Sequence, residues 1–208
     1  MPPPARRAAF VGTPATTGAL TRTLRSPNRP RSMAHAPALA VADDLAPRFA
    51  RERPADAHAV EGLIVRAFGP GRLAKTAERL REGREPLRAL SFVAWSDGEA
   101  VGCVRQWPIL IGETRALFLG PIAVEHNWRR HGLGGDLIRH ARDAAVRAGE
   151  DLILLVGDRP FFGPLGFSAD LTGRVRLPGP VDPARLLARE LIAGAAAGLA
   201  GAVRSIAA

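Results

Sequence analysis

Residues 119–135 read LGPIAVEHNWRRHGLGG and decide the order of elements in this chain. The apolar residues up to Val124 predict the end of a strand that begins near Arg115, and Gly120-Pro121 within it predicts a bulge or a broken ladder. The glycines after Trp128 predict a tight turn that opens a helix over 134–148. A strand, a glycine-rich turn and a helix therefore follow one another directly.

The glycine-rich turn has the chemistry of a polyphosphate site. Its glycines let the backbone approach a ligand closely, its N–H groups point inward, and the positive end of the helix dipole faces the anion. The neighbouring arginines add charge-assisted hydrogen bonds. The alternative is an ordinary glycine-rich helix start with a solvated basic patch. The predicted phosphate-binding residues are Arg129, Arg130, His131, Gly132, Leu133, Gly134 and Gly135.

Further strands and helices are predicted on both sides of this stretch, from hydrophobic periodicity and from turn signals such as Asp97-Gly98. The apolar run Leu152–Val156 is typical of a strand that is covered on both faces. The predicted elements are a helix ending at Phe68, a helix over 73–82, strands over 90–95 and 100–107, a strand over 152–156, a strand over 171–177 and a short helix over 183–192.

These motifs resemble the acetyl-CoA signature of the GNAT superfamily of N-acetyltransferases. In that signature a strand with a small apolar triplet precedes Arg/Gln-x-x-Gly-x-Gly/Ala, as residues 122–124 precede the turn here. A second marker, an aromatic pair followed after three residues by Gly-Phe, is present as Phe161-Phe162 and Gly166-Phe167. The resemblance covers residues 47–180, and the tail over 177–191 resembles a poorly characterised bacterial branch.

The resemblance implies an α/β fold of three layers, with helices on both faces of a central mixed, mostly antiparallel sheet that contains a splayed parallel strand pair. It implies acetyl-CoA as the acyl donor and an amine of a small molecule or a protein as the acceptor. The pantetheine arm would lie between the splayed strands and pair with the backbone of Ile122, Ala123 and Val124, as an added strand does. A free N–H near the bulge would stabilise the oxyanion of the reacting thioester.

The groups that transfer protons have several candidates. The family often protonates the departing thiolate with a tyrosine at the place that Phe162 occupies, and this chain contains no tyrosine. The alternatives are water, Cys103, another group, or lost activity. For the base that deprotonates the amine we consider Glu125 first, because it ends the strand that carries the thioester, and then His126 and Glu113. The alternative for each of the three is a solvated surface residue.

The net charge of +9 does not predict nucleic-acid binding, because residues 1–32 alone hold six arginines and no acidic residue. No nucleic-acid-binding motif accompanies the charge. The single cysteine excludes an internal disulfide, and the histidines lack the spacing of a zinc site. No apolar run reaches the roughly 20 residues of a membrane-spanning helix. We therefore expect a soluble cytoplasmic protein with no metal.

We expect three segments in the chain: a disordered leader rich in Pro, Arg and Ala over 1–45, a GNAT domain over 47–180, and a C-terminal helical extension over 181–208. The function expected is acyl-CoA-dependent N-acetyl transfer. The second hypothesis, prompted by the missing tyrosine, is a catalytically inactive domain that binds acyl-CoA as a sensor or structural module. No motif identifies the acceptor or the oligomeric state.

Overall fold

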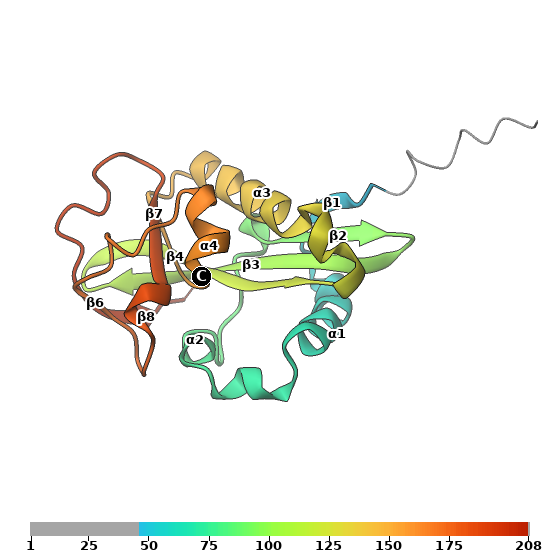
Figure 1. Cartoon of the computed structure of the whole chain (residues 1–208), viewed down its shortest axis with the longest axis horizontal. Helices are drawn as coiled ribbons and strands as arrows, with labels where there is room; N and C mark the ends of the chain where they lie inside the picture. The colour runs from blue at the N-terminus through green and yellow to red at the C-terminus, as the bar shows by residue number, and fades with distance from the viewer. Residues whose placement is uncertain (1–45, 208) are drawn as a thin grey trace, which may run out of the picture. The chain divides into compact units, whose positions relative to one another are not determined.

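The computed structural model describes residues 46–207, so the leader expected over 1–45 lies outside the described residues. Its strands and helices follow one another along the chain as labelled in Figure 1, with three consecutive strands between α2 and α3. They are β1 (Arg48–Arg51), α1 (Ala57–Phe68), α2 (Thr76–Arg79), β2 (Phe92–Ser96), β3 (Glu99–Ile111), β4 (Thr114–Val124), α3 (Leu133–Arg147), β5 (Leu152–Val156), α4 (Arg159–Phe162), β6 (Val175–Arg176), β7 (Leu186–Glu190) and β8 (Gly201–Ser205).

The described strands form one mixed sheet in the order β1-β2-β3-β4-β5-β7, with β8 paired to both β3 and β6. Within the main path only β4 and β5 are parallel, and the other neighbours are antiparallel. The expected mixed, mostly antiparallel sheet is confirmed. The predicted hairpin is present as β2 and β3, in which Ser96 pairs with Glu99 across Asp97-Gly98.

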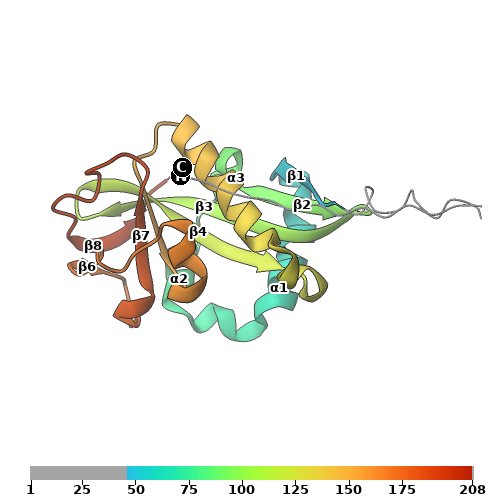
Figure 2. The same cartoon turned by 45° about the horizontal axis from the view of Figure 1, so that its top comes forward.

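One face of the sheet is covered by α1 and the other by α3 (Figures 1 and 2). The apolar stripe of α1 is formed by Val60, Leu63 and Ile64, which are fully buried against the side of the sheet that carries Cys103 and Ala123. This stripe follows from the 3.6-residue period of the helix. Helices on both faces of a central sheet give the expected three layers.

The long helix α3 packs closely on the opposite face. Leu133, Leu137 and Ile138 belong to the core cluster on this side. A β-carbon on Gly102 of β3 would stand 2.9 Å from the nearest Leu137 carbon, so glycine at this position lets the helix lie close to the strand. This contact fixes the start of α3, and with it the glycine-rich turn, against the middle of the sheet.

The predicted irregularity at Gly120-Pro121 is present as a bulge in β4. Val104 of β3 pairs with Ile122 and Gln106 pairs with Leu119, so the two intervening β4 residues face only Arg105. Close to this point β4 also parts from β5, because their parallel pairing is confined to Leu117 with Ile153 and Phe118 with Leu154. Beyond Phe118 the two strands are splayed, as the resemblance implied.

The expected C-terminal helix over 183–192 is wrong. The structure has a 3-10 turn at Pro183–Arg185 followed by β7, which pairs antiparallel with β5. Leu186, Leu187 and Ala188 are buried there, because pairing with β5 covers an edge that would otherwise be open. Tertiary packing therefore outweighs the local helical pattern. The segment over 181–208 supplies two strands of the sheet and is not a helical extension.

Two other elements are shorter than the pattern predicts. The second helix, expected over 73–82, is a 3-10 turn at Pro70–Ala74 followed by the single turn of α2. The strand expected over 171–177 is reduced to β6. The segment around α2 borders one cavity, and the segment around β6 borders a second, separate one.

Candidate active site

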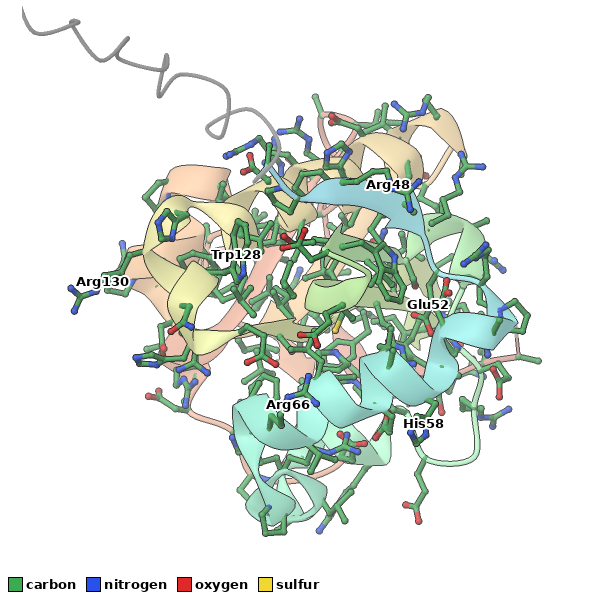
Figure 3. All side chains as sticks on the ribbon, turned by 90° about the vertical axis from the view of Figure 1, so that its right-hand side faces the viewer. Arg48, Glu52, His58, Arg66, Trp128 and Arg130 are labelled. Carbon is green, nitrogen blue, oxygen red and sulfur yellow. The ribbon has the colours of Figure 1, made fainter. Side chains whose placement is uncertain are left out.

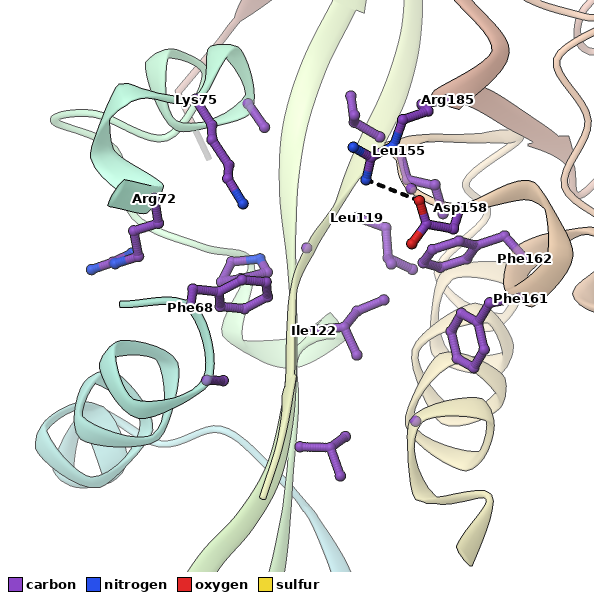
Figure 4. A pocket seen from close by; sticks show the side chains of 18 of the residues that line it. Phe68, Arg72, Lys75, Leu119, Ile122, Leu155, Asp158, Phe161, Phe162 and Arg185 are labelled. Carbon is purple, nitrogen blue, oxygen red and sulfur yellow. Dashed lines mark ion pairs between the residues drawn. The ribbon is translucent and has the colours of Figure 1, made fainter. Parts of the chain in front are cut away.

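A cavity of about 950 Å³ opens where β4 and β5 part. Its walls come from the middle of β4, the start of α3, the end of β5 with α4, and the connection between α1 and α2 (Figure 4). The segment over 180–185 adds to the rim. The bulge in β4 and the glycine-rich turn, which the sequence singles out separately, thus face one space.

The splayed part of β4 forms the wall in the middle of the cavity. Ile122 and Val124 line the cavity, whereas the side chain of Ala123 lies on the opposite face in the core beneath α1. This alternation follows from the two-residue period of a strand. Since β4 and β5 are no longer paired here, the backbone groups of this segment that point away from β3 have no strand partner. One of them, the carbonyl of Val124, accepts a hydrogen bond from Arg129 Nε at 3.1 Å.

The glycine-rich turn divides into residues that line the cavity and residues that do not. Gly132 has a φ of 76° in the left-handed region, which favours glycine, and it immediately precedes the first residue of α3. Gly134 and Gly135 line the cavity beyond it. A β-carbon on Gly134 would stand 3.3 Å from the ring of Phe161, so glycine leaves this surface free.

The charged residues of the turn point in different directions. Arg129 lines the cavity, whereas Arg130 and His131 are exposed and do not line it. Figure 3 shows Arg130 projecting away from the fold. Leu133, also predicted as part of the site, is 2% exposed and packs in the core, so only its backbone is at the turn.

A second cation at this end of the cavity comes from Arg139 of α3, which is not among the predicted phosphate-binding residues. It lines the cavity one turn after Gly135, and its Nη1 lies 3.4 Å from the position of a β-carbon on that glycine. Its Nη2 is paired with Asp136 at 2.5 Å. The sequence feature that could have predicted this placement is the i, i+4 spacing of Gly135 and Arg139, which puts the two residues on one helix face.

The aromatic pair closes the cavity on the α4 side. Phe161 is exposed and lines the opening, whereas Phe162 is 8% exposed and meets Phe161 edge to face with 4.9 Å between ring centroids. The ring of Phe162 lies over Gly157, where a β-carbon would come within 2.1 Å of it. The structure therefore places a carbon-only ring at the position for which the resemblance implied a tyrosine.

The predicted bases lie outside the cavity wall. Glu125 follows β4, but its carboxylate accepts a hydrogen bond at 2.7 Å from Arg66 at the end of α1 (Figure 3). His126 is exposed on the adjacent 3-10 turn. Glu113 lies in the β3–β4 turn at the other end of the strand and is paired with Arg204 at 3.4 Å. The three residues are thus not brought together.

Cys103, one of the alternatives for protonating the thiolate, lies on the far face of the sheet in the core beneath α1. It is fully buried, and burial away from water raises the pKa of its thiol to about 12. A thiol in this position has no path to the cavity and is chemically inert.

The connection between α1 and α2 contributes charged residues that no sequence motif indicated. Arg72 pairs with both Glu61 and Glu78, and Glu78 also pairs with Arg81 at 3.3 Å. Lys75 lies with its ammonium 5.6 Å from the centroid of the Phe68 ring, a cation–π contact. Except for Glu61, these residues line the cavity. Figure 4 shows Phe68, Arg72 and Lys75 on the other side of β4 from α3.

Behind this wall the ion pairs continue into the core. Glu52, which has a fully buried side chain, accepts hydrogen bonds from Arg105 Nε and Nη2 at 2.9 and 2.8 Å, and it pairs with Arg88 at 3.2 Å. Arg105 in turn reaches Glu61 of α1 at 3.3 Å. Because Arg105 is the residue opposite the β4 bulge, this network ties the bulge to the α1–α2 connection.

Over residues 46–207, no group of three or more His, Cys, Asp or Glu residues is arranged to hold a metal ion. No helix in the same range has both the length and the apolar character needed to cross a membrane.

Comparison with known proteins gives a consistent family. A family model described as "Acetyltransferase (GNAT) domain" matches residues 88–169. The uncharacterised N-acetyltransferase YhbS of Escherichia coli K12 is 29% identical over 133 residues, which cover 62% of this chain and 78% of YhbS. The crystal structure of E. coli YhbS in complex with CoA has a TM-score of 0.68 at 26% identity, over 78% of this chain and 91% of that chain. A GNAT family acetyltransferase of Brucella melitensis in complex with acetyl-CoA has a TM-score of 0.50 at 28% identity, over 70% and 96%.

Proposed function

Because this chain belongs to the GNAT superfamily of N-acetyltransferases, we propose that it transfers the acetyl group of acetyl-CoA to an amine, with the donor held in the cavity between β4 and β5. The observation that carries the proposal is the combination of a splayed strand pair with a glycine-rich helix start on the same cavity. Two related structures have CoA or acetyl-CoA bound, which supports the choice of donor.

The pyrophosphate of the donor is assigned to the turn before α3. The N–H groups that begin a helix have no partner within the helix, and the helix dipole favours an anion at that end. Gly132 and Gly134 leave this surface uncovered, and Arg129 and Arg139 add positive charge beside it. We assign no direct role to the side chains of Arg130, His131 and Leu133, which lie away from the cavity.

The pantetheine arm is assigned to the gap between the splayed strands, where it would pair with the backbone of residues 122–124. Its direction, from the turn toward the bulge, brings the thioester to Gly120-Pro121. The carbonyl of Gly120 is already occupied, since it accepts a hydrogen bond from Trp107 Nε1 at 2.6 Å. An N–H beside the bulge is then the donor we assign to the thioester oxygen.

In the transfer step the amine nitrogen attacks the thioester carbon, and the carbon–sulfur bond of the resulting intermediate breaks. The amine loses one proton, and CoA leaves as the thiolate. Each carboxylate that lines the cavity already has a donor: Glu78 has two arginines, Asp158 has Arg185 at 3.1 Å, and Asp182 has a backbone N–H. Glu125 stays our prediction for the base, acting through solvent, because it lies outside the cavity wall.

A second candidate function, binding of acyl-CoA without transfer, is favoured by one observation. Phe162 provides no proton for the thiolate, and the structure places its ring at the cavity. Replacement Phe162→Tyr separates the two candidates further: in a transferase limited by thiolate protonation it raises turnover, while CoA affinity stays unchanged. A large loss of CoA affinity in this variant would mean that the ring packs where no hydroxyl fits.

The deciding experiment measures release of free CoA thiol when the full chain is incubated with acetyl-CoA and a library of amines. Acetyl-CoA binding is measured in parallel by calorimetric titration. Binding with amine-dependent thiol release is the result expected of the transferase. Binding with no release for any amine favours the inactive module, and absence of binding would refute both.

A further inference from the structure

The cavity wall on the α1–α2 side carries more positive than negative charge. Arg72, Lys75 and Arg81 line it, with Glu78 as the single carboxylate of the same segment. This wall lies across β4 from the helix start that is assigned to the donor pyrophosphate (Figure 4). Its excess charge is therefore separate from the phosphate-binding turn, and it faces the space that remains for the acceptor.

Arg81 is a largely buried cation of this wall. Its side chain is 12% exposed and its guanidinium lies over the ring of Phe118, 5.1 Å from the centroid. Its counterion Glu78 is shared, because Glu78 also pairs with Arg72. The Nε of Arg81 is buried and has no hydrogen-bond partner among the described residues. Burial lowers the pKa of this guanidinium to about 10. A buried donor without a partner is costly unless a ligand supplies one.

Arg81 also lies beside the reaction centre. One terminal nitrogen of its guanidinium is 2.9 Å from the point where a β-carbon on Gly120 would stand, so the cation touches the bulge of β4. The thioester carbonyl is assigned to the same bulge. An anion bound by Arg81 would thus be held within a few bonds of the amine that attacks.

Lys75, the single lysine of the chain, provides a second cation without a counterion. Its side chain extends from the α1–α2 connection toward β4 (Figure 4). Within residues 46–207 it forms no ion pair, and its one charge contact is with the face of Phe68. By contrast, Arg185 on the opposite wall is neutralised by Asp158.

We propose that the acceptor is a small amine that carries an anionic group, a carboxylate or a phosphate, and that Lys75 and Arg81 bind this group. The inference rests on the proposed acetyl transfer and specifies its substrate class. Two cations on one wall match an anion that accepts several charge-assisted hydrogen bonds. An amino acid meets the geometric condition best, because its amine and carboxylate are separated by a single carbon atom.

The proposal is tested with matched probes that differ only in the anionic group. Thiol release from acetyl-CoA is measured with L-amino acids and the corresponding carboxamides, and with phosphoethanolamine and ethanolamine. We expect kcat/KM for the best acidic amine to exceed that of its neutral counterpart by about tenfold or more, the effect of one charge-assisted contact. The amino-acid and phosphate arms identify which anion is used.

Variants at Lys75 test whether this wall causes the preference for acidic amines. Lys75 is chosen because Arg81 is largely buried and its replacement risks unfolding. Lys75→Met should lower the ratio of acidic to neutral kcat/KM by about tenfold, mainly through KM of the acidic amine, and Lys75→Arg should preserve it. The matched control is Arg84→Gln, an exposed arginine on the following segment that does not line the cavity. An equal or greater rate with the neutral amines, or an unchanged ratio in Lys75→Met, would overturn the proposal.

A binding measurement separates failure of this proposal from failure of the proposed function. Saturation-transfer NMR is recorded on the CoA-loaded protein with the same acidic and neutral probes. Selective binding of an acidic amine that is lost in Lys75→Met supports the anion site even where no thiol is released. Absence of selective binding overturns it, whether or not other amines are acetylated.

Discussion

Substitution Gly134→Asp tests the phosphate site most directly. A β-carbon at this position would lie 3.3 Å from the ring of Phe161 and 3.8 Å from a methyl group of Val124, at the cavity wall. The added carboxylate would stand where the pyrophosphate is assigned. Two unit charges about 4 Å apart repel by roughly 4 kcal/mol at an effective dielectric constant of about 20. We therefore expect the Kd for CoA to rise by about a thousandfold.

The same substitution should leave the domain folded. An acidic residue in the first turn of a helix interacts favourably with the helix dipole by about 0.3–1 kcal/mol. The contact with Phe161 is made with a ring that is 47% exposed and has room to move. The unfolding midpoint in urea is expected to stay close to that of the wild type. The substitution then weakens the complex with CoA and leaves the stability of the free domain unchanged.

Calorimetric titration with CoA and with pantetheine, which lacks the pyrophosphate, measures the effect. Affinity for CoA should fall far more than affinity for pantetheine. Gly134→Ala isolates the steric part, and Asn127→Asp adds the same charge at an exposed position of the preceding turn that does not line the cavity. Equal losses for CoA and pantetheine, or an equal loss in Asn127→Asp, would refute the assignment of the phosphate site.

Three further substitutions test other parts of the site. Arg129→Ala should weaken CoA binding by roughly 1–3 kcal/mol, whereas Arg130→Ala should not, and a reversed order in titration would contradict the placement of the two side chains. Glu52→Gln should lower the free energy of unfolding in urea by about 3 kcal/mol, because it leaves buried arginines without their counterion. Its control is Glu113→Gln, at a side chain that is 95% exposed, for which a loss below about 1 kcal/mol is expected. Glu125→Gln should lower kcat/KM by about tenfold or more if this residue is the base, and full activity would remove it from the mechanism.

The parts of the fold that the sequence predicts are those encoded by local patterns. The run Leu152–Val156 is a strand with the predicted bounds because five consecutive apolar residues suit a position covered on both faces. The bulge at Gly120-Pro121 was predictable because proline has no N–H for the ladder. The glycine-rich turn was predictable for a similar reason, since Gly132 requires a left-handed backbone that glycine adopts readily.

The parts that the sequence does not predict depend on contacts between distant segments. Residues 183–192 have a local helical pattern, but the edge of β5 recruits them as a strand. The cavity wall to which we assign the acceptor has no motif at all, because Lys75 and Arg81 come to lie at the cavity only when the segment after α1 folds back beside the bulge. Arg139 was missed for a related reason. A polar residue on a helix predicts that the position is exposed, but it does not predict whether a cavity opens beside it.

The missing tyrosine is the main argument against catalysis, and its energetic weight is small. An alkyl thiol has a pKa near 8.5, about 1.5 units above neutral pH. Departure as the thiolate, without a proton, therefore costs roughly 2 kcal/mol at pH 7. Correct positioning of two reactants contributes about 7–11 kcal/mol. The structure has the features to which we assign positioning of the donor: the splayed strands, the bulge and the turn at Gly132. Phe162 therefore removes a minor contribution to the rate and leaves the larger one in place, which is why amide formation from a thioester remains feasible in a chain without a phenol.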